Sequence, residues 1–222
     1  MDKGKFFNSI RSLFGHLSLS QVQGIEAILD EAEKRGTPRN WLAYVFATAF
    51  HETARTMQPI REFGRGRGMK YGTTYYGRGL VQLTWKYNYE KAGKKLGVDF
   101  VTNPDRVLES RYAIPIAFDG MEEGWFTGKD LAKEIDLVDE SDTEDAREFR
   151  EARRIINGTD RAQTIAGYGI TFEKALKDSG WENDPRGHEN PVVPPVLPVP
   201  PPKPQFSSLG KPGNVPMNIG GS

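Results

Sequence analysis

Residues 51–89 read HETARTMQPIREFGRGRGMKYGTTYYGRGLVQLTWKYNY, and this stretch holds most of the chemically informative side chains of the chain. It contains Glu52 and Glu62 and ends in a cluster of glutamine, threonine, tyrosine and asparagine. Two carboxyl groups can act as the acid and the base that cleave a bond between sugars, and neutral polar groups can hold sugar hydroxyls and a water molecule. The stretch therefore indicates glycoside chemistry.

The residues around the two glutamates predict different environments for them. Residues 41–50 are mostly apolar and too few to span a membrane, so they predict a buried helix. Glu52 would then lie at the edge of the core, where burial raises the pKa of a carboxyl group and keeps it protonated as a general acid. Glu62 lies in a turn rich in glycine and arginine, where solvent and the arginines at positions 61, 65 and 67 should keep it ionised.

Hydrophobic periodicity predicts a mainly helical fold with a small irregular β element. Ser18 or Ser20 is expected to cap the second helix, and Thr37 the third, with Pro38 at its first helical position. Residues 60–83 predict short strands and turns, because glycine is frequent there. The expected helices cover about residues 3–14, 20–35, 38–56, 85–96, 110–125, 144–156 and 161–178, with an acidic exposed loop over 136–147.

Composition limits the classes of function. Lys+Arg and Asp+Glu both number 30, so no net charge steers the chain to nucleic acid. The chain has no cysteine, which excludes disulfides and thiolate metal sites. The first residues lack the unbroken apolar core of a secretory signal, and we expect no membrane span, no metal and no cofactor.

The C-terminal part of the chain has a different composition. Residues 191–216 contain ten of the 15 prolines, and proline removes backbone donors and fixes φ. The sequence therefore predicts a catalytic domain over residues 1–185 and an extended Pro-rich tail over 186–222. A Pro-x-x-Pro pattern in the tail could bind a partner protein, although a plain linker accounts for the same composition.

The motif HET at residues 51–53, followed by YGRGLVQLTWKYNY at 76–89, resembles the signature of family-19 glycoside hydrolases, the chitinase-like enzymes of the lysozyme superfamily. The segment IING at residues 155–158 resembles the downstream substrate-binding segment of that family. The resemblance covers about residues 15–180 and implies an α+β lysozyme-like fold. The short form without cysteines is more similar to bacteriophage and prophage endolysins than to secreted plant chitinases.

The resemblance also implies roles for individual residues. Glu52 matches the general acid, Glu62 the general base, and Thr84 the hydroxyl residue that holds the attacking water. Members of the family invert the anomeric centre, which requires room for water between the two carboxyl groups. The candidate substrate-binding residues are His51, Tyr76, Arg78, Gln82, Trp85, Tyr87, Asn88 and Asn157.

Several of these residues also have a structural interpretation. His51 can pack beside the site, and Arg78, between two glycines, can tie loops together through carboxylate or carbonyl contacts. Trp85 can stack on a sugar or belong to the core. The alternating glycines and arginines of residues 64–68 lack the strand and helix of a phosphate-binding loop. They predict a flexible basic rim that attracts an anionic glycan.

The predicted function is that of a peptidoglycan-degrading endolysin that hydrolyses β-1,4 bonds of the glycan strand. It would act from the host bacterial cytoplasm on the periplasmic wall, after a holin, which the resemblance implies as a partner, has permeabilised the membrane. A chitinase of the same fold is an alternative, because both substrates carry β-1,4-linked N-acetylated sugars. A virion-associated protein that binds the cell wall and is anchored by the Pro-rich tail is another.

Overall fold

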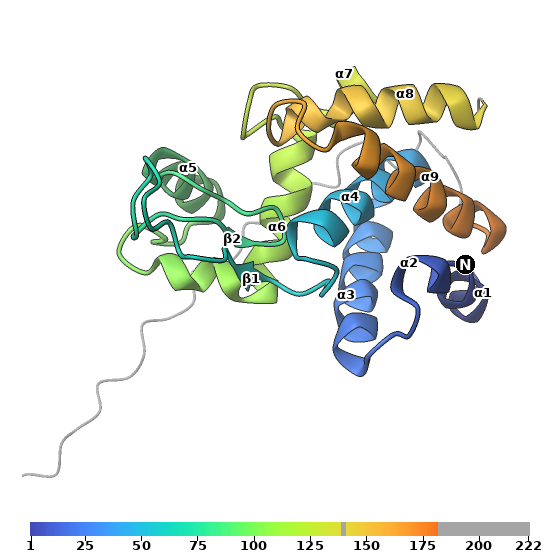
Figure 1. Cartoon of the computed structure of the whole chain (residues 1–222), viewed down its shortest axis with the longest axis horizontal. Helices are drawn as coiled ribbons and strands as arrows, with labels where there is room; N and C mark the ends of the chain where they lie inside the picture. The colour runs from blue at the N-terminus through green and yellow to red at the C-terminus, as the bar shows by residue number, and fades with distance from the viewer. Residues whose placement is uncertain (139–140, 182–222) are drawn as a thin grey trace, which may run out of the picture.

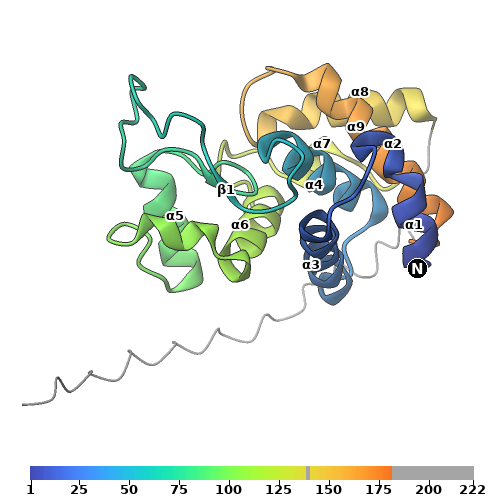
Figure 2. The ribbon, with the colours of Figure 1, turned by 60° about the horizontal axis from the view of Figure 1, so that its bottom comes forward.

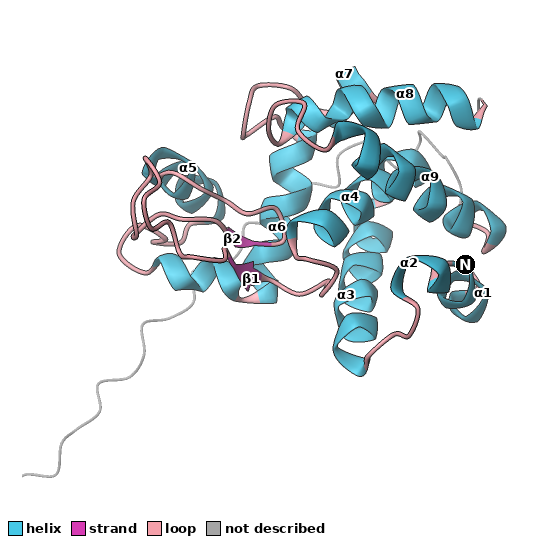
Figure 3. Ribbon diagram, viewed as in Figure 1, coloured by secondary structure: helices cyan, strands magenta, loops and turns pink. Residues whose placement is uncertain are grey.

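The computed structural model describes residues 1–138 and 141–181, and these residues are mostly helical (Figure 1). Strands β1 (Ile60–Arg61) and β2 (Arg78–Gly79) pair antiparallel, and the 3-10 helices are η1 (Pro104–Leu108) and η2 (Arg153–Ile155). Figure 3 shows the strands among long loops. The predicted mainly helical fold with a small β element is confirmed. The α-helices are α1 (Lys3–Ser9), α2 (Arg11–Phe14), α3 (Leu19–Arg35), α4 (Arg39–Glu52), α5 (Lys86–Leu96), α6 (Ser110–Glu122), α7 (Leu131–Glu134), α8 (Asp142–Ala152) and α9 (Ala162–Asp178).

Helix α4 is the buried centre of a helical lobe formed with α1 to α3, α8 and α9 (Figures 1 and 2). Every residue of α4 from Arg39 to Phe50 is buried, as the apolar run predicts. The ring of Phe46 stacks on Phe172 of α9 with centroids 5.1 Å apart, and Tyr44 donates a hydrogen bond of 2.8 Å to the carbonyl of Ala152. This packing fixes the end of α4, where Glu52 lies.

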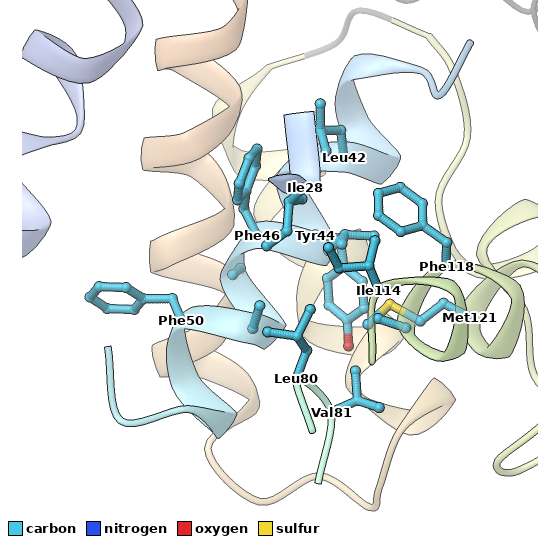
Figure 4. Close-up of a cluster of buried hydrophobic side chains, with 14 of the residues drawn as sticks. Ile28, Leu42, Tyr44, Phe46, Phe50, Leu80, Val81, Ile114, Phe118 and Met121 are labelled. Atoms are coloured by element: carbon cyan, nitrogen blue, oxygen red, sulfur yellow. The ribbon is translucent and has the colours of Figure 1, made fainter. Parts of the chain in front are cut away.

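A second lobe contains α5, η1 and the loops around the two strands, and α6 lies between it and the helical lobe (Figure 2). Leu80 and Val81 follow β2 directly and are buried in the same hydrophobic cluster as Tyr44 of α4 and Ile114 of α6 (Figure 4). The cluster therefore anchors the loop segment on α4. This contact sets the position of the 51–89 stretch relative to the helical lobe.

Helix α4 ends at Glu52, four residues earlier than the sequence predicts. The hydroxyl of Thr53 donates to the carbonyl of Ala49 (2.7 Å) and accepts from the backbone N–H of Met57 (3.0 Å). A side chain that bonds to nearby backbone groups offers them an alternative to the helix, and the chain turns after Thr53. Glu52 is therefore the last helical residue.

Other boundaries also differ from the prediction. The first helix is two helices, α1 and α2, separated at Ile10. Pro38 is the N-cap residue of α4, so Thr37 lies before the cap. Helix α8 begins at Asp142, two residues before the predicted start and within the predicted acidic loop, and its first turn carries three acidic residues that favour a helix N-terminus. The cap at Ser18 is confirmed, as part of a capping box with Gln21.

The two remaining predictions concern the C-terminal tail and membrane-spanning helices. The boundary at residue 185 and the extended Pro-rich tail over 186–222 lie outside the described residues. Within the described residues, no helix combines the length and the apolar character that crossing a membrane requires.

Candidate active site

A cleft of about 970 Å³ brings together side chains from four parts of the chain. Glu52 contributes from the end of α4, and further lining residues come from segments 62–88, 126–129 and 154–159. The predicted site residues that line this cleft are Glu52, Glu62, Gln82, Thr84, Trp85, Tyr87, Asn88 and Asn157. Residues far apart in sequence thus meet in one cleft.

Glu52 lies beside a buried cation. Its side chain is 16% exposed, and its Oε1 lies 2.7 Å from Nη1 of Arg153, whose side chain is only 3% exposed. The N–H groups of Nη1 are not aligned for a hydrogen bond, so the contact is mainly electrostatic attraction. Nε of Arg153 donates to the carbonyl of Asp160 (3.1 Å), which holds the guanidinium in place. The sequence-based expectation considered only apolar neighbours, and the structure adds a buried cation in contact with the carboxyl group of Glu52.

Glu62 follows β1 and accepts hydrogen bonds on both carboxylate oxygens. The hydroxyl of Tyr71 donates to Oε1 (2.6 Å), and the backbone N–H of Gly77 donates to Oε2 (3.0 Å). Burial and the adjacent carboxylate raise the pKa of Tyr71 to about 12, so its hydroxyl keeps its proton at neutral pH. Arg61, one of the predicted partners of Glu62, instead forms an ion pair with Asp105 (2.8 Å).

Gln82 and Thr84 line the cleft together with the two carboxyl groups. Nε2 of Gln82 donates to the carbonyls of Ile60 and Gly79, both at 3.2 Å, and so ties β1 to β2. Thr84 donates its hydroxyl proton to the carbonyl of Gln82 (2.7 Å). Since that proton is engaged, the oxygen of Thr84 can accept a hydrogen bond from a molecule in the cleft.

Aromatic rings form one wall of the cleft. Trp85 is 38% exposed and Tyr87 is 59% exposed, and their rings stack with centroids 6.3 Å apart. Tyr71 meets the ring of Trp85 edge-on at 5.5 Å. Trp85 is therefore an exposed wall residue and not a core residue, and its ring belongs to a surface on which the apolar face of a sugar can stack.

Asn88 and Asn157 line the cleft from two distant parts of the chain. Nδ2 of Asn88 donates to the carbonyl of Thr84 (2.9 Å), at the start of α5. Oδ1 of Asn157 accepts a hydrogen bond from the backbone N–H of Gly158 (2.9 Å), and the side chain of Asn157 is exposed. Both side chains can contribute further polar groups to a ligand.

Three predicted substrate-binding residues do not line the cleft. His51 faces α9, where its ring lies 6.5 Å from that of Tyr168, and burial lowers the pKa of His51. The guanidinium of Arg78 lies 3.7 Å above the buried ring of Tyr76 and donates to Oδ1 of Asp105 (2.7 Å). Arg78 also donates to the backbone carbonyls of residues 74 and 76, so its contacts tie the loops together.

Sequence reasoning missed the two partners of the glutamates and one wall of the cleft. In the sequence, Arg153 is one of many charged residues in a segment of mixed acidic and basic side chains. Tyr71 follows a glycine-rich segment and belongs to no recognisable motif. Neither position carries a local signal, because each contact depends on tertiary packing. The unpredicted wall consists of Phe126, Thr127, Lys129 and Arg154.

Comparison with known proteins gives consistent results. The sequence model of the family described as chitinase class I, glycoside hydrolase family 19, matches residues 35–140. An endochitinase of Arabidopsis thaliana is 36% identical over 121 residues, which cover 47% of this chain and 42% of the relative. An inactive chitinase-like protein of Hevea brasiliensis is 52% identical over 40 residues, covering 18% of this chain and 13% of that protein. The chain thus spans less than half of the length of these relatives, and local identity alone does not establish activity.

A solved structure agrees at the level of the fold. The crystal structure of a mutant of chitinase C has a TM-score of 0.52 and 19% sequence identity, and the match covers 80% of this chain and 77% of the other. The segment matched by the family model contains both glutamates, both strands and the predicted signature over 76–89. Residues 35–140 of this chain are therefore similar to the chitinase class I sequences of glycoside hydrolase family 19.

Proposed function

We propose that the protein is a glycoside hydrolase that cleaves β-1,4 bonds between N-acetylated sugars with inversion at the anomeric carbon. The observation that carries the proposal is the shared cleft of Glu52 and Glu62, whose surroundings differ. Glu52 is mostly buried beside Arg153, whereas Glu62 is held by a tyrosine hydroxyl and a backbone N–H. Carboxyl groups in unlike environments can divide the roles of acid and base.

In the proposed reaction, Glu52 first takes up a proton and then donates it to the leaving glycosidic oxygen as the bond from the anomeric carbon to that oxygen breaks. A water molecule attacks the opposite face of the carbon and gives a proton to Glu62. Thr84 accepts a hydrogen bond from this water. Once Glu52 has lost its proton, the adjacent Arg153 cation stabilises the new negative charge.

The family favours chitin as the first substrate to test, since the relatives named above are an endochitinase and a chitinase-like protein. Peptidoglycan is the second candidate, because the exposed loop beside the cleft carries the cations Arg65, Arg67 and Lys70. If peptidoglycan is the substrate, the predicted endolysin role, the access to the periplasm through a holin and the anchoring role of the tail follow as further proposals.

The test uses the full chain, chitin oligomers and purified peptidoglycan. We expect Glu52→Gln and Glu62→Gln each to lower the cleavage rate by about 100-fold or more, because each removes one proton-transfer group. Glu33→Gln, at an exposed position of α3, is the matched control. Proton NMR of the fresh products reports the anomer. Near-wild-type cleavage by either glutamine variant would exclude the assigned role, and retention of the anomer would exclude the single displacement.

A further inference from the structure

The loop after Glu62 carries an excess of positive charge. Residues 63–89 contain five arginine and lysine side chains and no aspartate or glutamate. Two of these cations are neutralised from outside the segment, Arg78 by Asp105 (2.7 Å) and Lys86 by Glu90 (3.4 Å). The other three are Arg65, Arg67 and Lys70, which are exposed and form no ion pair within the part of the chain that the structure describes.

The backbone of this loop forms a series of tight turns. The N–H groups of residues 65, 67, 69 and 72 donate to the carbonyls three residues earlier, at 3.0 to 3.2 Å. Gly66 has φ +72°, and a Cβ there would lie 2.1 Å from the carbonyl oxygen of Gly72, so only glycine fits. The repeated turns give the three cations a defined place on the surface.

The loop is also closed onto the candidate active site. It starts at Glu62, and its last turn leads to Tyr71, whose hydroxyl bonds back to the carboxylate of Glu62 (2.6 Å). Met69 and Tyr71 line the cleft itself. The cations at positions 65, 67 and 70 do not line the cleft, but they lie on the same loop as Glu62, Met69 and Tyr71, which do. This loop therefore places them at the rim of the cleft.

The opposite wall does not offer the same excess. Lys129 pairs with Glu134, and Arg154 pairs with Glu151, so the two cations that line that wall are already neutralised. The loop also exposes Phe63, at 83%, beside its cations. The rim thus combines unpaired positive charge with apolar surface on one side of the cleft.

We propose that Arg65, Arg67 and Lys70 form a binding site for the carboxylates of an anionic glycan. The inference rests on the proposed function and narrows its substrate class to an N-acetylated β-1,4 glycan that carries carboxylate groups, in preference to neutral chitin. Exposed cations attract such groups over about 8 Å at physiological ionic strength, and added salt weakens the attraction. Peptidoglycan, with carboxylates on its lactyl and peptide substituents, has this chemistry.

The experiment compares the full wild-type chain with the triple variant Arg65→Gln, Arg67→Gln, Lys70→Gln. Binding to peptidoglycan sacculi and to chitin powder is measured by co-sedimentation, and kcat/KM is measured on solubilised peptidoglycan strands and on chitin oligomers, at low and at physiological salt. We expect the triple variant to lose about tenfold in binding and in kcat/KM on peptidoglycan at low salt, because three exposed charge contacts each contribute a few-fold. Values on chitin should stay within about twofold.

A matched control removes three exposed cations elsewhere, with Lys5→Gln, Arg11→Gln and Lys94→Gln. This control variant should bind and cleave both substrates like wild type, with the same salt dependence. The inference is refuted if the triple variant binds sacculi with the affinity and salt dependence of wild type. It is also refuted if the triple variant loses binding to chitin and to sacculi equally, or if wild type binds and cleaves chitin better than peptidoglycan. Absence of cleavage with intact, salt-dependent binding to sacculi would instead refute the proposed function and leave the rim site supported.

Discussion

The contact between Glu52 and Arg153 can be tested by replacing one partner and then both. Arg153→Met keeps much of the apolar stem of the arginine but removes its charge. Glu52→Gln keeps the shape of the glutamate and removes its charge. If the two groups stabilise each other, each single variant leaves one charge without its partner in a poorly solvated place, and the double variant leaves neither.

The structure sets the expected magnitude. At the observed separation of 2.7 Å, two unit charges attract by about 6 kcal/mol at an effective dielectric constant of roughly 20. Most of this is offset by the cost of removing Arg153 from water, and Glu52 keeps contact with solvent in the cleft. We therefore expect Arg153→Met to lower the free energy of unfolding by about 3 kcal/mol, with a coupling energy to Glu52 of about 2 kcal/mol.

Urea unfolding of the four proteins at neutral pH measures this coupling. Arg153→Met also removes the hydrogen bond to the carbonyl of Asp160, but this loss occurs in both arms of the cycle and cancels. Additive single effects, with a coupling energy below about 0.5 kcal/mol, would show that the short distance does not correspond to a stabilising pair. The electrostatic role given to Arg153 in the reaction would then lose its support.

Three further predictions concern residues around the cleft. Tyr71→Phe removes one hydrogen bond that holds the carboxylate of Glu62, so kcat should fall by roughly fivefold, and an unchanged kcat would contradict this role. Burial lowers the pKa of His51, so the unfolded chain takes up a proton first as the pH falls. The free energy of unfolding should therefore decrease below a pH of about 6.5, and urea unfolding of His51→Phe should show a smaller decrease than wild type. Arg78→Met should lower the free energy of unfolding by about 3 kcal/mol, since Asp105 loses one of its two arginine partners and the carbonyls of residues 74 and 76 each lose a donor. A loss below about 1 kcal/mol would contradict the loop-tying role.

Much of the fold follows from local sequence patterns. Apolar spacing and capping residues predict the existence of most of the helices, and the capping box at Ser18 and the glycine after Arg35 mark both ends of α3. The end of α4 was less predictable. It depends on the hydroxyl of Thr53, which forms hydrogen bonds with the backbone of Ala49 and Met57 and not with solvent.

The sequence predicted the site residues that belong to the motif. It did not predict the residues that contact the two glutamates. The motif residues Glu52, Glu62 and Thr84 meet in one cleft. Their surroundings come from Arg153 after α8 and from Tyr71 in a loop, and no pattern near either residue indicates its contact. The residues that surround a side chain depend on tertiary packing. The sequence neighbours therefore predicted arginine partners for Glu62 and apolar surroundings for Glu52, and neither prediction included Tyr71 or Arg153.

Hydrogen bonding within the signature separates residues that build the frame from residues that face a ligand. Arg78 directs its donors to Asp105 and to backbone carbonyls, and the amide N–H groups of Gln82 contact two carbonyls of the strands. Trp85 and Tyr87, by contrast, expose large parts of their rings to the cleft. A polar side chain whose donors already have buried partners gains little from a sugar hydroxyl, because a new contact would replace an existing one. Substitution at Arg78 should therefore act first on stability, and substitution at Trp85 or Tyr87 on substrate affinity.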